Sequence, residues 1–163
     1  MSEPVATADA AEIPDPSPAS LARLGAQEAT LRISLAPTAA VISRSSHGLE
    51  VWYPARLAFA PDETELLVSA TAMLDLLARS LREHEHTTVV VAVYTDAIGN
   101  SDYNEQQSLS RAAAVIAYLE AKGVAPTRLV ARGAGESAPL EAPSTPEGRD
   151  LNRRLEVLIT PLS

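Results

Sequence analysis

The strands of this chain can be predicted from its runs of apolar residues. Residues 88–94 form an almost unbroken β-branched run, which is typical of a central strand covered on both faces. The alternation of Leu31, Ile33 and Leu35 predicts a strand at residues 30–35, and the segment 21–24 could form a short helical turn before it. Three further strands are expected, at residues 49–53, 128–132 and 155–160.

Apolar residues at helical spacing predict two long helices. The first covers about residues 62–84, where Asp62–Glu65 form a capping box and a leucine-rich stripe follows. The second opens with the capping box Asp102–Glu105 and ends before Gly123, which occupies the position of a C′ glycine. A third helix is expected to begin at Thr145, because a proline follows it at the first helical position.

The resulting order of elements, β-α-β-α-β-α-β, indicates an α+β fold with helices packed on one mixed sheet in two layers. Residues 1–27 are rich in Ala, Pro, Asp and Ser and hold few large apolar side chains. They are therefore expected to form a flexible tether ahead of a domain at residues 28–163. Deleting the tether is expected to leave the melting temperature nearly unchanged.

Charge and cysteine content exclude several functions. The formal net charge is −8, which argues against a nucleic-acid partner, because a protein that binds phosphates carries a basic face. The chain has no cysteine, so disulfides, thiolate metal sites and cysteine nucleophiles are excluded. Its first residues show neither a signal peptide nor a membrane span.

One acid and one arginine stand at a spacing that suits an amino-acid ligand. Asp96 follows the apolar strand where it breaks into a glycine turn, and Arg111 lies 15 residues on, inside the second predicted helix. A guanidinium forks onto a carboxylate, and a carboxylate accepts an ammonium, so the pair could hold a zwitterion. From the residues alone, a salt bridge between the two is the more common role of such a pair.

Several motifs resemble, in order, those of the OmpA-like C-terminal domain family. They are Thr95-Asp96, Gly99, Tyr103-Asn104, Ser108, Arg111-Ala112, Gly148-Arg149 and Asn152-Arg153-Arg154. The resemblance covers residues 88–159 and extends more weakly back to Gly48. It implies a non-catalytic periplasmic domain, attached to the outer membrane or cell envelope, that binds peptidoglycan through the diaminopimelate of the stem peptide and needs no cofactor or metal.

The resemblance also implies which residues bind the ligand. The acid at the Asp96 position takes the ligand's ammonium, and the arginine at the Arg111 position takes its carboxylate. The other residues implied to line the site are Thr95, Gln107, Phe59, Ala97 and Arg154. Tyr103 and Asn104 are expected to pack and cap the start of the second long helix.

Three residues depart from the family pattern. Gln107 stands in place of the usual leucine, Val93 in place of a glycine, and Ala60 in place of an aspartate. Gln107 and Ala60 favour an alternative function, a protein-interaction module on the same fold that does not bind the cell wall. A partner protein in the envelope and a homodimer are both left open.

Catalytic and metal-binding interpretations are weaker. A peptidoglycan hydrolase would need two convergent carboxylates or a metal site, and the motif region offers one acid. His84 and His86 flank Glu85, but two histidines at this spacing on a helix end do not converge on one ion. This segment is predicted to be a solvated loop.

Overall fold

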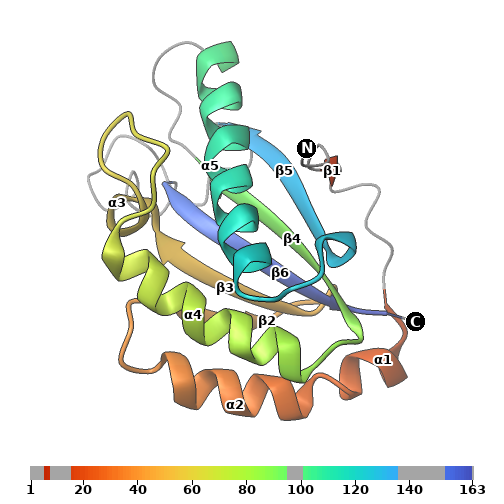
Figure 1. Cartoon of the computed structure of the whole chain (residues 1–163). Coiled ribbons are helices and arrows are strands. Elements are labelled where there is room, and N and C mark those ends of the chain that lie inside the picture. Colours follow the sequence, from red (N-terminus) through yellow and green to blue (C-terminus); the bar gives the residue numbers. More distant parts are fainter. Residues whose placement is uncertain (1–5, 8–15, 95–100, 136–152, 163) are drawn as a thin grey trace.

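The computed structural model describes residues 6–7, 16–94, 101–135 and 153–162, which form a mixed sheet with helices packed on one face (Figure 1). The strands are β1 (Ala6–Thr7), β2 (Val41–Arg44), β3 (Leu49–Pro54), β4 (Thr87–Tyr94), β5 (Leu129–Gly135) and β6 (Arg154–Pro161). Their order in the sheet is β1-β5-β4-β6-β3-β2. Because β4 runs parallel to β5 and antiparallel to β6, the predicted central strand and mixed sheet are confirmed.

The helices are α1 (Pro18–Ala22), α2 (Gly25–Leu35), α3 (Ala55–Ala58), α4 (Val68–Glu83) and α5 (Ser101–Ala121), with a 3₁₀ turn η2 (Pro126–Arg128). The second long helix is confirmed as α5, and Gly123 after it adopts φ +100°, as a C′ glycine should. The helix predicted to begin at Thr145 lies outside the described residues. Within the part of the chain that the structure covers, no helix is both long and apolar enough to cross a membrane.

The core lies between the sheet and the helices. Alternate residues of the inner strands point into it, among them Val51, Val91 and Val157, each at most 1% exposed. Leu77 of α4 and Ile116 of α5 meet them from the helix layer. This burial of large aliphatic groups on one face of the sheet holds the two layers together.

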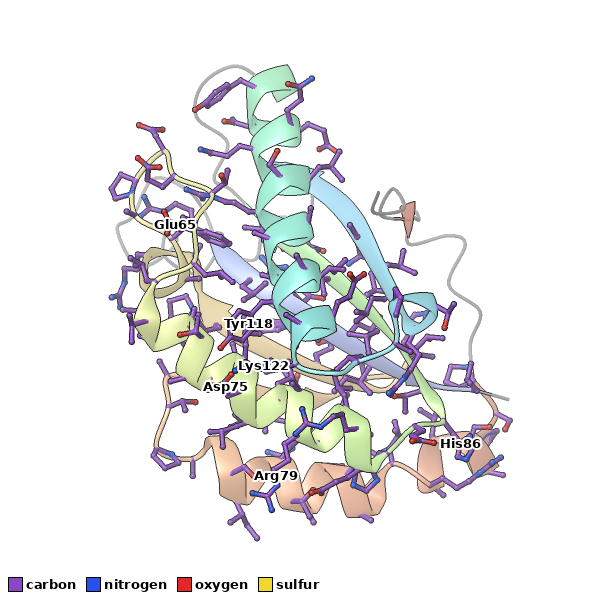
Figure 2. All side chains as sticks on the ribbon, viewed as in Figure 1. Glu65, Asp75, Arg79, His86, Tyr118 and Lys122 are labelled. Atoms are coloured by element: carbon purple, nitrogen blue, oxygen red, sulfur yellow. The ribbon has the colours of Figure 1, made fainter. Side chains whose placement is uncertain are left out.

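Two polar contacts join α4 to the C-terminal end of α5 (Figure 2). The Tyr118 hydroxyl donates to the Asp75 carboxylate at 2.6 Å, and the Lys122 ammonium lies 3.4 Å from the same carboxylate. The bond to Asp75, followed by desolvation, raises the pKa of the Tyr118 phenol. These contacts fix the end of α5 that lies away from Arg111.

The predicted strand at residues 30–35 is wrong, because these residues belong to helix α2. Leu31 and Leu35 are buried, whereas Ile33 between them is 78% exposed. Burial at positions i and i+4 is the pattern of a helix, and the apparent alternation arose because Ile33 is apolar but faces solvent. The edge strand beside β3 is β2, which buries none of its residues fully.

The predicted capping box at Asp62–Glu65 is also wrong. Helix α4 begins at Val68 with Leu67 at the N-cap, and no side chain caps it. Asp62 adopts φ 61°, in the left-handed region, and Leu66 forms an isolated β-bridge with Phe59. Residues 59–67 therefore form a loop, and its carbonyl groups have another use, described below.

The tether does not extend to residue 27. Ser17 caps α1, and α1 and the first turn of α2 occupy residues 18–27. Leu24 is 2% exposed and Gln27 is fully buried, with its Nε2 donating to Ser80 Oγ at 3.2 Å. A few well-placed side chains thus anchor a segment whose average composition resembles a linker.

Candidate functional site

The site forms where α5 passes the carboxyl end of β4. The buried Ser108 hydroxyl donates to the carbonyl oxygen of Val93, next to the last residue of the strand. This bond fixes the position of α5 along β4. Arg111 follows three residues later on the same side of the helix, so its side chain also lies near the carboxyl end of β4.

The Arg111 guanidinium holds the loop at residues 59–67. Its Nε donates to the carbonyl of Glu63 at 2.8 Å, and its Nη2 donates to the carbonyl of Ala60 at 3.3 Å. The guanidinium carbon also lies 4.9 Å from the centre of the Phe59 ring, a cation–π contact. One edge of the fork is therefore occupied, while Nη1 has no hydrogen-bond partner among the described residues.

The surroundings of Arg111 favour binding of an anion. Only 9% of the residue is exposed, and burial lowers the pKa of its guanidinium, opposed by the charges of Asp62 and Tyr103. Within the described ranges, no carboxylate forms an ion pair with Arg111 at 4.0 Å or less. A nearly buried cation of this kind gains strongly from a charge-assisted bond to a carboxylate. The edge formed by Nη1 and Nη2, which has no further partner among the described residues, can donate two parallel hydrogen bonds to such a group.

The structure places the predicted ligand-binding residues at different points. Thr95, Asp96 and Ala97 lie outside the described residues. Phe59 is 2% exposed beneath Arg111, and Gln107 lies half-buried on α5, one helical turn before it. These two predicted residues therefore share one region with Arg111.

Arg154 lies on the opposite face of the sheet. Its guanidinium carbon is 3.8 Å from the centre of the Tyr94 ring and 5.1 Å from that of Trp52. It also pairs with Glu156 at 3.2 Å. The pKa of Glu156 is raised because burial outweighs the attraction of Arg154 and Arg132. Arg154 is not brought to Arg111, and its contact with a ligand stays a prediction.

Some contributors to the site were missed by sequence reasoning. The carbonyls of Ala60 and Glu63 hold Arg111, but a backbone acceptor carries no residue type that a motif could show. No sequence signal pointed to them, because the helix start at Val68 was established only by the structure. Ser108 belongs to the family motif, and its part in seating α5 became visible only from the fold.

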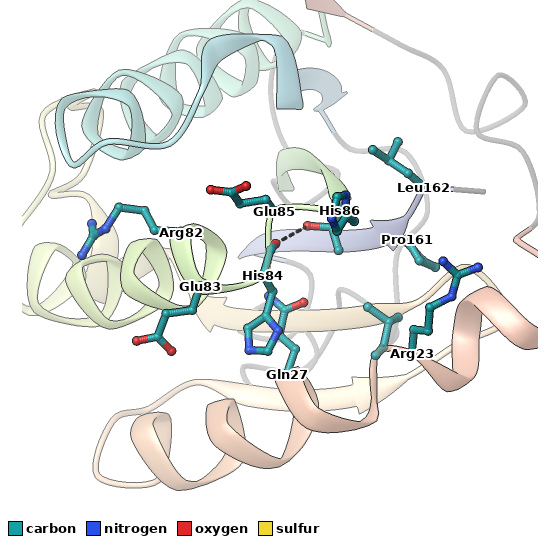
Figure 3. A pocket seen from close by; sticks show the side chains of 11 residues that line it. Arg23, Gln27, Arg82, Glu83, His84, Glu85, His86, Pro161 and Leu162 are labelled. Atoms are coloured by element: carbon teal, nitrogen blue, oxygen red, sulfur yellow. Dashed lines mark hydrogen bonds between the residues drawn. The ribbon is translucent and has the colours of Figure 1, made fainter.

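A separate hollow of about 340 Å³ lies at the other end of β4, between α2, the end of α4 and the end of β6 (Figure 3). The residues that line it include His84, Glu85 and His86, together with Gln27, but none of the predicted ligand-binding residues. In the described ranges of the chain, no group of three or more His, Cys, Asp or Glu residues could hold a metal ion. The hollow marks where the N-terminal helices meet the start of β4.

The fold is that of a two-layer α+β domain with a mixed sheet, and comparison with known proteins gives the family. The model of the OmpA family matches residues 58–153. This chain belongs to the OmpA family.

Individual relatives agree in fold and sequence. A putative MotB-like protein from Desulfovibrio vulgaris superposes with a TM-score of 0.77 at 24% identity, covering 88% of this chain and 99% of that one. The probable lipoprotein YiaD of Escherichia coli is 33% identical over 136 residues, which are 83% of this chain and 62% of that protein. The peptidoglycan-binding protein ArfA of Mycobacterium tuberculosis is 34% identical over 103 residues, 63% of this chain and 32% of that protein. The chain thus spans less than two thirds of the length of either curated relative.

Proposed function

We propose that this chain binds peptidoglycan non-covalently through the diaminopimelate of the stem peptide, and so anchors the protein to which it belongs to the cell wall. Arg111 takes a carboxylate of the ligand, and Asp96 takes its ammonium. Membership of the OmpA family and the similarity to ArfA support the binding of peptidoglycan. A protein with this role works in the periplasm, where the cell wall lies.

The observation that carries the proposal is the fixed position of the Arg111 guanidinium. Two loop carbonyls and the Phe59 ring hold its guanidinium in place before any ligand arrives, so little side-chain freedom is left to lose on binding. The other edge of the guanidinium, formed by Nη1 and Nη2, has no further partner among the described residues, and its two parallel N–H groups match the geometry of a carboxylate.

The departures at Ala60 and Gln107 do not remove this arrangement. Ala60 serves Arg111 through its carbonyl oxygen, which any residue would supply. Gln107 is half-buried and adds an amide next to the site, where it can donate to or accept from a polar ligand. A protein-interaction module without cell-wall binding is the alternative, and the binding experiment separates the two.

The test is calorimetry with meso-diaminopimelate, lysine and glycine on the parent protein, Arg111→Lys and Asp96→Ala. The lysine substitution keeps the charge but loses the fork, so diaminopimelate should bind about 1–2 kcal/mol more weakly. Asp96→Ala should lose binding while the protein stays folded. Lysine lacks the second carboxylate and should bind the parent more weakly than diaminopimelate does.

Thermal melts of all variants provide the control, because Arg111→Lys also removes the two bonds to the loop. Arg79→Lys is a matched substitution in an exposed ion pair on α4 and should leave binding unchanged. Equal affinity of the parent protein and Arg111→Lys for diaminopimelate would refute the forked contact. Failure of the parent to retain either diaminopimelate or purified sacculi would favour the interaction module.

A further inference from the structure

Tyr103 is the one strongly exposed aromatic side chain of this protein. All six Phe, Trp and Tyr residues lie within the described residues. Tyr103 is 54% exposed, whereas the other five are buried or half-buried. The expectation that Tyr103 packs at the start of the helix is therefore wrong, although Asn104 beside it is only 8% exposed. An exposed aromatic ring of this kind offers a flat apolar surface with a polar tip.

The position of Tyr103 relates it to the ligand site. The first turns of α5 extend beyond the end of the sheet (Figure 1). Tyr103 and Arg111 are eight residues apart on this helix, a separation of about 12 Å along its axis and roughly 80° around it. Ser108, which lies between the two in the chain, donates to the carbonyl of Val93 near the carboxyl end of β4, so both residues belong to the part of α5 at this end of the sheet.

The chemistry of the proposed ligand fits this spacing. Diaminopimelate is the third residue of a stem peptide whose first residue is joined to a sugar of the glycan strand. Three extended residues span roughly 10 Å, so a stem peptide held at Arg111 carries its sugar to about the distance of the first turns of α5. A pyranose presents an apolar face of C–H groups and a rim of hydroxyls, and a tyrosine presents a flat apolar ring with a polar tip.

We propose that the exposed Tyr103 ring is a platform for the sugar that bears the stem peptide, so the protein reads the glycan strand as well as the peptide. This inference rests on the proposed function at Arg111. The ring packs against the C–H face of the sugar, and the tyrosine hydroxyl remains exposed to solvent at the border of the contact. The protein then binds a stem peptide that is attached to its sugar more tightly than a free stem peptide.

The experiment compares two soluble ligands on the full chain by calorimetry. One is the disaccharide-tetrapeptide muropeptide that contains meso-diaminopimelate, and the other is the same tetrapeptide without sugars. The parent protein should bind the muropeptide about three- to tenfold more tightly than the peptide, the range that an aromatic contact supplies. Tyr103→Ala should lose this preference and keep its affinity for the peptide. Tyr103→Phe should keep most of the preference.

Tyr103→Leu is the matched control for shape, because it retains an apolar side chain without a flat face. It should behave like Tyr103→Ala if stacking is responsible. A parent protein that binds both ligands equally would overturn the platform while leaving the Arg111 site intact. An equal loss for both ligands in Tyr103→Ala would assign Tyr103 to the peptide site instead. Failure of the parent to bind either ligand would overturn the proposed function itself.

Discussion

Arg128 stabilises the start of β4 by hydrogen bonds to the backbone. It ends the 3₁₀ turn η2, and its guanidinium donates to the carbonyls of Leu81, His84 and Thr87 at 2.7–2.9 Å. A further bond reaches the Thr87 hydroxyl at 2.7 Å. The side chain therefore satisfies carbonyl groups at the end of α4 that the helix itself leaves without partners.

Arg128→Lys should lower the free energy of unfolding by about 1–3 kcal/mol, because one ammonium cannot reach all four acceptor atoms on three residues. Urea unfolding measures the change. Arg79→Lys replaces an arginine in an exposed pair and should shift stability by less than about 0.5 kcal/mol. Equal effects of the two substitutions would show that the bonds of Arg128 contribute nothing specific.

Single residues were predicted unevenly from the sequence. Arg111 was identified because it stands 15 residues after Asp96, inside the second predicted helix, at a position of the family motif. The importance of Arg128 was not visible, since its partners are mostly carbonyl oxygens, which every residue has. Tyr103 was expected to pack, because an aromatic residue in a helical pattern usually does. Its exposure is decided by how far α5 extends beyond the sheet.

At the scale of elements, periodicity predicted the buried strands and the long helix α5 but not α2 or the start of α4. The apolar run of β4 was predicted correctly as a strand because it is short and rich in β-branched residues, and the structure buries nearly all of it. Short apolar patterns are ambiguous. The exposed Ile33 lies between the buried Leu31 and Leu35, so this part of a helix showed the alternation expected of a strand. The start of α4 was predicted too early, because residues 59–67 form a loop. Two carbonyl groups of this loop accept hydrogen bonds from Arg111 instead of taking part in a helix.

The N-terminal elements give a test of where the folded unit begins. Deleting residues 1–15 removes β1, a strand of two residues, and should change the melting temperature by about 2 °C or less. Deleting residues 1–27 also removes α1, Leu24 and the buried Gln27, and should cost about 2–5 kcal/mol.

Differential scanning calorimetry on the two truncated proteins and the parent would measure both changes. The longer deletion also takes away the partner of Ser80 on α4. Similar melting temperatures for the two truncated proteins would restore the tether interpretation for residues 16–27.

At the scale of the whole molecule, the sheet has two unlike faces. One packs against the helices with aliphatic side chains, and the other carries Arg154, Glu156 and Tyr94 in contact with one another. Burial raises the pKa of Glu156 above its ordinary value of 4.5. The folded protein therefore holds this proton more tightly than the unfolded chain does.

The pH dependence follows from this difference. The stabilising contribution of protonated Glu156 is fully present below about pH 4.5 and is lost as the pH rises through the pKa of the folded state. The parent protein should therefore lose stability relative to Glu156→Gln as the pH is raised above that value. Urea unfolding of both proteins across the range measures the difference, and other groups cancel because both proteins share them. A difference independent of pH, or one of opposite sign, would contradict the assignment.

The proposed ligand site and the chain segments that could join it to other structures lie at opposite ends of the sheet. Arg111 lies beside the carboxyl end of β4, while α1 and the last residues of β6 lie at the other end, where Leu162 donates to the carbonyl of His86. Force that enters through α1 or the end of β6 and leaves through a ligand at Arg111 runs lengthwise along β4 and β6. The hydrogen bonds between these strands lie across that direction and share the strain in shear, instead of opening one at a time. A bound wall strand should therefore detach before the sheet unravels.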